Sequence, residues 1–277
     1  MRWCVRIFRA WSNCSSNIEC RTFVSCRRSR RRSSSPATAI DAIVKSFLAI
    51  LHLCDSLFPV GAFAYSDGLE AAAVLWMTDH RRQDAERSVE HLRAWMDVTL
   101  DETIGRLDGP AVWRAWHAFR EERWDVIVAL DEELTALRPS VAARRSSRAI
   151  GLRVLTTWST LHPDPRLEDA LARARSGRLG PTLAVAFAGA CACGGVGRRR
   201  SVEAFAYTRL AATVSAAMRL LPIGQAGAHG LLARALDRVP AVVDGIARRD
   251  APPESFAPAL DIAAMSQQYL HSRLFRS

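Results

Sequence analysis

Residues 54–72 read CDSLFPVGAFAYSDGLEAA and join two segments that both have helical character. The residues leading into this stretch, AIDAIVKSFLAILHLC (39–54), place apolar side chains at the 3.6-residue spacing of one helix face. That face consists of Ile40, Ile43, Val44, Phe47, Leu48 and Leu51. Pro59 fixes its own φ and Gly61 permits a sharp change of direction, so the first helix ends here. We expect a second helix to begin near Phe63 and to run through LEAAAVLWM.

The remainder of the chain shows the same helical spacing. AERSVEHLRAWMDVTLDETIGRL places Val89, Leu92 and Trp95 on one face, and Pro110 falls where the first turn of the next helix is expected. No stretch alternates with period 2, and Pro and Gly residues separate about ten helical segments. The sequence therefore predicts an all-α fold, with a single globular domain of about ten helices over residues 39–277.

Residues 1–38 differ from this domain in composition. Residues 1–35 carry nine Arg and one acidic residue, Glu19, so most of the net charge of +10 lies there. The segment has no periodicity, which predicts a disordered, basic extension. Its Arg- and Ser-rich composition is compatible with a transit peptide. The composition favours a start codon assigned too far upstream, because Lys45 is the only Lys in the chain and this bias is typical of GC-rich coding DNA.

Several classes of function are disfavoured by composition. Beyond residue 35 the chain is nearly neutral, so we predict no nucleic-acid binding. The apolar stretch LAVAFAGACACGGVG is shorter than the ~20 residues of a membrane span, so we predict no membrane association. Its Cys191 and Cys193 lie among small residues, a pattern that favours buried thiols over metal ligands. The lack of a disulfide framework is typical of a reducing, cytoplasmic location.

No catalytic motif is present. The chain has no phosphate-binding loop, no dinucleotide fingerprint and no HExxH sequence. The seven His residues are scattered, and the acidic clusters at 121–122 and 131–133 accompany no nucleophile. We therefore predict no catalytic residue and no metal site, which favours a binding or scaffold role. The alternative is a helical metal-dependent enzyme whose site residues meet only in the folded chain.

Three separated motifs resemble one family. LFPVGAFAYSDGLEAA (57–72) resembles LPVGGFSYSHGLE of the urease accessory protein UreF family. AAMRLLPIGQAGAHGLL (216–232) is similar to that family's AVRLVPLGQTDGQRLL, and ALDIAAMSQQYLHSRLFRS (259–277) is similar to LDIASMRHETQYSRLFRS. An Arg-rich segment, LRPSVAARRSSRAIGLRVL (137–155), also resembles a family helix. The resemblance extends from about residue 45 to residue 277.

The resemblance implies an all-helical cytoplasmic chaperone for nickel insertion into the urease apoprotein. It implies a homodimer that binds the accessory protein UreD (also called UreH) and links it to the nickel-carrying GTPase UreG. It further implies that nickel is handled through the complex and that no cofactor is bound tightly. The motif residues that the resemblance marks for partner binding are Pro59, Gly61, Phe63, Tyr65, Ser66, Gly68, Leu69, Glu70, Pro222, Gly224, Gln225, Arg273, Leu274, Phe275, Arg276 and Ser277.

The chain departs from the family at a few of these motif positions. Ala62 and Ala64 stand where the family has Gly and Ser, and Gln267 and Gln268 stand where it has His and Glu. Gln keeps the size and hydrogen-bonding capacity of Glu but has no charge, so any contact made by that His-Glu pair is expected to be weaker here. The closing RLFRS matches fully, and we expect its Phe275 to dock into a groove on a partner instead of packing into the core.

Overall fold

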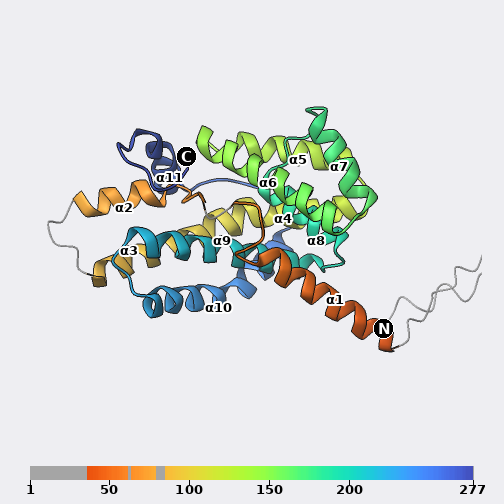
Figure 1. The fold of residues 1–277 in the computed structure, drawn as a ribbon, viewed down its shortest axis with the longest axis horizontal. Coiled ribbons are helices and arrows are strands. Elements are labelled where there is room, and N and C mark those ends of the chain that lie inside the picture. The colour runs from red at the N-terminus through yellow and green to blue at the C-terminus, as the bar shows by residue number, and fades with distance from the viewer. Residues whose placement is uncertain (1–35, 62–63, 79–84, 277) are drawn as a thin grey trace, which may run out of the picture.

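The computed structural model describes residues 36–61, 64–78 and 85–276 (Figure 1). Within these residues the chain forms α-helices and no strand, which confirms the predicted all-α class. The α-helices are α1 (Pro36–Cys54), α2 (Leu69–Thr78), α3 (Ala85–Val98), α4 (Gly109–Arg120), α5 (Trp124–Ala136), α6 (Val141–Leu161), α7 (Pro165–Arg175), α8 (Leu183–Cys193), α9 (Arg198–Leu220), α10 (Gln225–Arg249) and α11 (Pro258–Ser266). A π-helix, η2 (Thr99–Asp108), and a 3-10 helix, η3 (Gln267–Tyr269), are also present. The extension predicted for residues 1–38 lies almost wholly outside the described residues.

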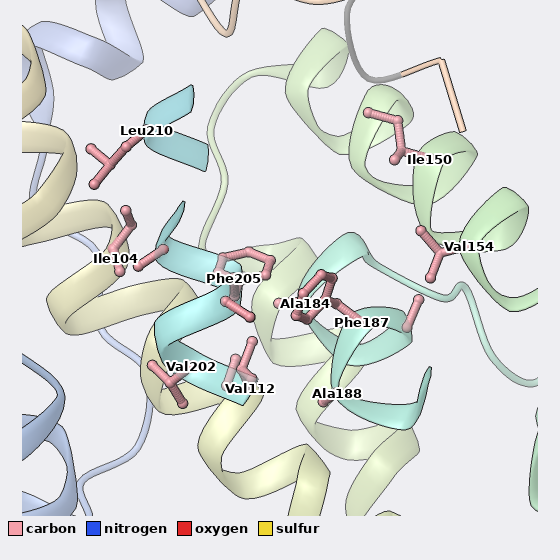
Figure 2. Close-up of a cluster of buried hydrophobic side chains, with 14 of the residues drawn as sticks. Ile104, Val112, Ile150, Val154, Ala184, Phe187, Ala188, Val202, Phe205 and Leu210 are labelled. Atoms are coloured by element: carbon pink, nitrogen blue, oxygen red, sulfur yellow. The ribbon is translucent and has the colours of Figure 1, made fainter. Parts of the chain in front are cut away.

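Helix α8 lies at the centre of the core because its small residues allow other helices to approach closely. It packs against α4, α6 and α9, and nine of its eleven residues are buried (Figure 2). A Cβ on Gly189 would come within 2.7 Å of the Phe119 ring, so only Gly fits there. Cys191 is fully buried, and burial raises the pKa of its thiol, as expected for a thiol packed as a small apolar group.

Helices α3 and α4 are joined by η2 into one helical segment that passes through a proline. Pro110 has no N–H group, so the carbonyl of Arg106 loses its usual donor four residues later. The backbone instead widens to a π-helix, in which the N–H of Gly109 donates to Ile104 O. The N–H of Glu254 donates to the freed Arg106 carbonyl at 3.0 Å. A proline in the helix thus fixes where the irregular 250–257 connection crosses it.

Helix α1 forms where the apolar spacing predicts it, but the described residues leave its apolar face exposed. Ile40 is 60% exposed and Phe47 is 54% exposed, and the other members of that face are also exposed. The helix packs on α9 only toward its C-terminal end, and its N-terminal part points away from the other helices (Figure 1). An apolar helix face of this length in water indicates an interaction surface.

The predicted start of the second helix is wrong. Helix α2 begins at Leu69, six residues after the expected position. The backbone before it adopts positive φ at Gly61 (70°), Asp67 (51°) and Gly68 (93°), and such a path is incompatible with a continuous helix. Phe63, where we expected the helix to begin, lies outside the described residues.

Among the described helices, none combines the length and the apolar character that a membrane span requires.

Candidate interaction site at the C-terminal tail

The C-terminal tail is held against the segment that precedes α2 by a set of buried polar groups. We call this set the tail clamp; it comprises Ser66, Gly68, Glu70, Gln267, Leu274 and Phe275. At its centre is Glu70, whose side chain is buried in the first turn of α2. Its carboxylate accepts the backbone N–H groups of Leu274 and Phe275, the latter at 3.2 Å. Hydrogen bonds to an ionised acceptor are stronger than those between neutral groups, so Glu70 anchors the tail.

Gln267 completes the clamp with both ends of its amide. Its Oε1 accepts from Ser66 Oγ at 3.2 Å and from the Gly68 N–H at 3.1 Å, and its Nε2 donates to Glu70 at 3.3 Å. The residue is buried, whereas Gln268 is exposed. At the first of the two positions where the family has His and Glu, this chain therefore uses Gln for an internal contact.

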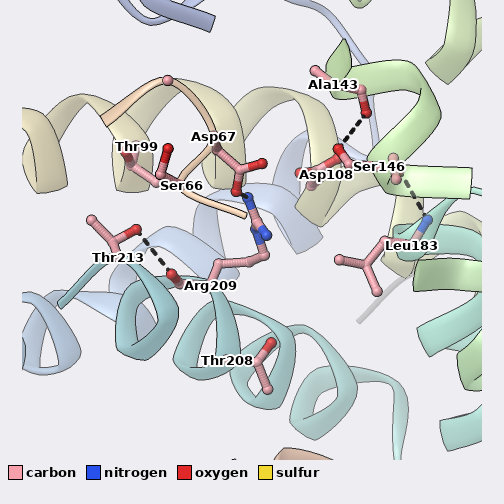
Figure 3. Close-up of polar contacts among 12 residues, drawn as sticks. Ser66, Asp67, Thr99, Asp108, Ala143, Ser146, Leu183, Thr208, Arg209 and Thr213 are labelled. Atoms are coloured by element: carbon pink, nitrogen blue, oxygen red, sulfur yellow. Dashed lines mark hydrogen bonds and ion pairs between the residues drawn. The ribbon is translucent and has the colours of Figure 1, made fainter. Parts of the chain in front are cut away.

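Gly68 is required by the close approach of α11. Its φ of +93° lies where side chains are disfavoured, and a Cβ would come within 2.6 Å of the Ala264 backbone nitrogen. Ser66 Oγ accepts from the Glu70 N–H at 3.4 Å, which gives a partner to one of the free N–H groups in the first turn of α2. Asp67 pairs with Arg209 of α9 (Figure 3).

The expectation that Phe275 faces outward to dock on a partner is wrong. Phe275 is only 4% exposed and belongs to the hydrophobic core, and the Arg219 guanidinium lies 4.3 Å from its ring centroid. The Arg276 N–H donates to Ala64 O at 2.7 Å, which forms an isolated parallel bridge with Tyr65. The tail is thus covered by its own chain, because the apolar ring finds a buried position beside α9. Leu274 remains 55% exposed.

The other sequence-predicted site residues lie in several parts of the fold. Leu69 is fully buried in the core, and Tyr65 lies beside the tail. Pro222, Gly224 and Gln225 are exposed at the turn between α9 and α10, and no described hydrogen bond joins them to the clamp. Ser277 lies outside the described residues.

Pro59 and Gly61 form the turn that follows α1. Pro59 is exposed, and Gly61 has a φ of +70°. Arg153 of α6 donates to Val60 O at 3.4 Å, and a Cβ on Gly61 would come within 2.7 Å of the Arg153 guanidinium. These two residues therefore shape the connection between α1 and α2, in line with their expected backbone roles.

Two ion pairs border a small cavity next to the clamp. The cavity has a volume of about 90 Å³ and is lined in part by Asp67, Arg209, Asp108 and Arg138. Arg138 pairs with Asp108, whose side chain is only 4% exposed, and Arg209 pairs with Asp67. The attraction of Asp67 raises the pKa of the Arg209 guanidinium, so Arg209 keeps its charge. This pair joins the 66–68 turn to α9.

Arg209 and Arg219 were not singled out by sequence reasoning. Arg219 lies inside the quoted 216–232 motif, so a signal for it was present. Arg209 has no such signal, because its partner Asp67 is 142 residues away and nothing local marks the pair.

Replacing Glu70 with Gln is expected to destabilise the clamp by about 2 kcal/mol. The neutral amide offers one acceptor oxygen to donors that now share a carboxylate, and hydrogen bonds to charged groups contribute ~1.5–3 kcal/mol. Urea unfolding followed by circular dichroism measures the loss. Glu168→Gln is the matched control, because Glu168 is exposed in the first turn of α7 and loses the same helix-dipole interaction. Equal losses in the two variants would contradict the role assigned to Glu70.

The described parts of this chain thus define an all-helical protein in which two distant motifs meet at a C-terminal clamp. Comparison with known proteins gives the family. The UreF family model matches residues 87–236. The chain is 31% identical over 236 residues to the urease accessory protein UreF of Ralstonia pickettii (strain 12J), covering 83% of this chain and 96% of the relative. This chain belongs to the UreF family.

Other relatives agree. The chain is 30% identical to the urease accessory protein UreF of Methylibium petroleiphilum, covering 89% of this chain and 98% of the relative. It is also 28% identical to the bifunctional urease accessory protein UreEF of Bordetella bronchiseptica, covering 92% of this chain and 57% of that longer protein.

Proposed function

We propose that the protein is a non-catalytic scaffold in urease maturation. In this proposal it acts in the cytoplasm as a homodimeric chaperone that binds UreD (UreH) and presents a platform to UreG. It couples the GTPase cycle of UreG to nickel delivery into the urease apoprotein. The observation that supports this most directly is that two of the motifs carrying the family likeness meet in the tail clamp, although Ser66 and Gln267 are 201 residues apart.

We propose that nickel is handled through the complex and that the chain holds no tightly bound cofactor of its own. Within the described residues, no group of three or more His, Cys, Asp or Glu side chains is placed to hold a metal ion. The alternative of a helical metal-dependent enzyme is favoured by no observation on this part of the chain.

The uncovered face of α1 supports the homodimer. It continues into a groove of about 590 Å³ between α1, the 55–60 turn and α9. Leu51 and Phe58 line one side of the groove, and Tyr207, which is 41% exposed, lines the other. Helix α1 has both an exposed apolar stripe and an apolar groove beside it. In a dimer with two-fold symmetry, the stripe of each copy can therefore pack into the groove of the other.

Phe47→Asp is expected to weaken this dimer at least tenfold without unfolding the protein. Phe47 is already 54% exposed in one copy, whereas its burial against a second copy contributes ~1.5–3 kcal/mol. Light scattering across a dilution series measures the dissociation constant. Ile262→Asp is the control, because Ile262 is 56% exposed on α11, which lies far from α1 (Figure 1). A wild-type chain that stays monomeric at high concentration, or an equal effect of both variants, would contradict the dimer proposal.

Partner capture tests the scaffold itself. The purified full chain is expected to retain UreD in a pull-down and to retain UreG when UreD is present. It is also expected to show no GTP hydrolysis alone. A chain that captures neither protein, or that hydrolyses GTP by itself, would exclude the proposed function.

A further inference from the structure

An open pocket lies between α6 and the outer side of the C-terminal tail. It has a volume of about 470 Å³. We call it the arginine pocket; its lining residues are Tyr65, Arg145, Ser146, Ala149, Arg273, Phe275 and Arg276. Arg145 comes from α6 and the other two arginines come from the tail, more than a hundred residues later in the chain. Three guanidinium-bearing side chains from two distant segments therefore converge on one concave surface.

Two of the three arginines of this pocket, Arg145 and Arg276, have no acidic partner among the described residues. None of the described lining residues is acidic. Surface arginines elsewhere behave differently: Arg238 pairs with Asp97 and Asp101, and Arg199 pairs with Glu203 and Asp244. Like charges gathered in a concave surface repel one another and create a positive potential, which an anionic ligand relieves.

The tail clamp holds this pocket in shape. Arg276 is fixed by its backbone N–H to Ala64 O, and Arg273 directly precedes the residue whose N–H binds Glu70. Ser146 donates its hydroxyl to Ala143 O at 3.1 Å, which fixes the floor of the pocket on α6 (Figure 3). The backbone that carries Arg273 and Arg276 is therefore ordered before a ligand binds, which reduces the entropy lost on binding.

We propose that the arginine pocket docks an acidic segment of a protein partner, with two or more carboxylates bound by Arg145 and Arg276. Guanidinium groups match carboxylates with paired, parallel hydrogen bonds, which gives the pocket its selectivity. A volume of about 470 Å³ equals roughly 15 water molecules, so a single small oxyanion would leave most of it filled with solvent. A chain segment with several side chains fills it. This inference rests on the proposed function, because it gives the chemistry of one partner contact.

The test uses the full chain and a hexaglutamate peptide that carries a photoreactive diazirine at one end. After irradiation, mass spectrometry locates the cross-linked residues, which separates the pocket from the basic residues 1–35. We expect cross-links at Tyr65 and Ala149, and at least a tenfold loss of them in Arg145→Glu. Arg175→Glu is the matched control, because Arg175 is exposed on α7 and the charge change is identical. A hexaglutamine peptide is expected to give no cross-links in the pocket.

Other outcomes would overturn the proposal. Cross-links confined to residues 1–35, or equal losses in Arg145→Glu and Arg175→Glu, would show general attraction to a basic chain. Complete displacement by inorganic phosphate at the concentration of the peptide would show a site for small oxyanions. Arg145→Lys keeps the charge. We expect it to reduce the cross-links in the pocket about threefold, because Lys lacks the forked guanidinium group that pairs with a carboxylate. The test contains no urease accessory protein, so its failure and the failure of partner capture are distinguishable.

Discussion

Gly68→Ala is expected to lower the free energy of unfolding by about 3 kcal/mol or more. The new Cβ would meet the Ala264 backbone nitrogen at 2.6 Å, and backbone cannot move aside as a flexible side chain can. The φ of +93° adds strain of ~1–3 kcal/mol for any residue with a side chain. Urea unfolding measures the loss, and the melting temperature is expected to fall by roughly 6–12 °C for a domain of this size.

Gly177→Ala separates the two causes. Gly177 has a φ of +73°, but a Cβ there meets no atom within 4 Å, so only backbone strain of about 1 kcal/mol is expected. If Gly68→Ala is no more destabilising than Gly177→Ala, the close packing of α11 on the 66–68 turn is refuted.

Phe275→Ala is expected to loosen the tail clamp by about 3 kcal/mol. Truncating a buried Phe costs ~3–5 kcal/mol, and the lower end applies because a terminal segment can detach without unfolding the whole domain. Amide hydrogen exchange of residues 66–70 and 274–276 measures this local opening. A change of 3 kcal/mol corresponds to an exchange rate more than about 100 times faster.

Leu274→Ala is the neighbouring control. Leu274 is 55% exposed, so its truncation is expected to change exchange in these amides less than threefold. Unchanged exchange in Phe275→Ala would mean that the ring does not hold the tail. Partner capture by both variants adds a second readout, because loss of capture in Leu274→Ala alone would assign docking to the exposed neighbour.

The helices were predictable because their signal is local. The apolar spacing that predicts α1, and the small residues that predict a buried α8, are written within short stretches of sequence. Local sequence does not determine which part of the molecule buries each helix face. The stripe containing Ile40 and Phe47 has the same spacing whether it is buried by its own chain or by another chain. Sequence periodicity therefore located α1 but could not show that the rest of the described chain leaves it exposed.

The site was predictable only in part, for a related reason. The motif around Gly68 and Glu70 was identified, but their partner Gln267 was noted only as a departure from the family. No local pattern shows that a carboxylate will accept N–H groups about two hundred residues away. Phe275 was misassigned because an apolar residue between arginines has the same sequence signature on a partner surface as in its own core. The family likeness identified the segments, and the fold supplied their contacts.

The tail clamp has a consequence for how the protein is made. The Phe275 N–H donates to Glu70, which lies 205 residues earlier in the chain. Translation proceeds from the N-terminus at ~5–20 residues per second. The helices up to α10 are therefore synthesised well before the clamp can close. Until residues 267–275 have emerged from the ribosome, the Glu70 carboxylate and the position for Phe275 stay open. A chain truncated before Leu274 cannot close the clamp, so clamp closure is a late step of folding.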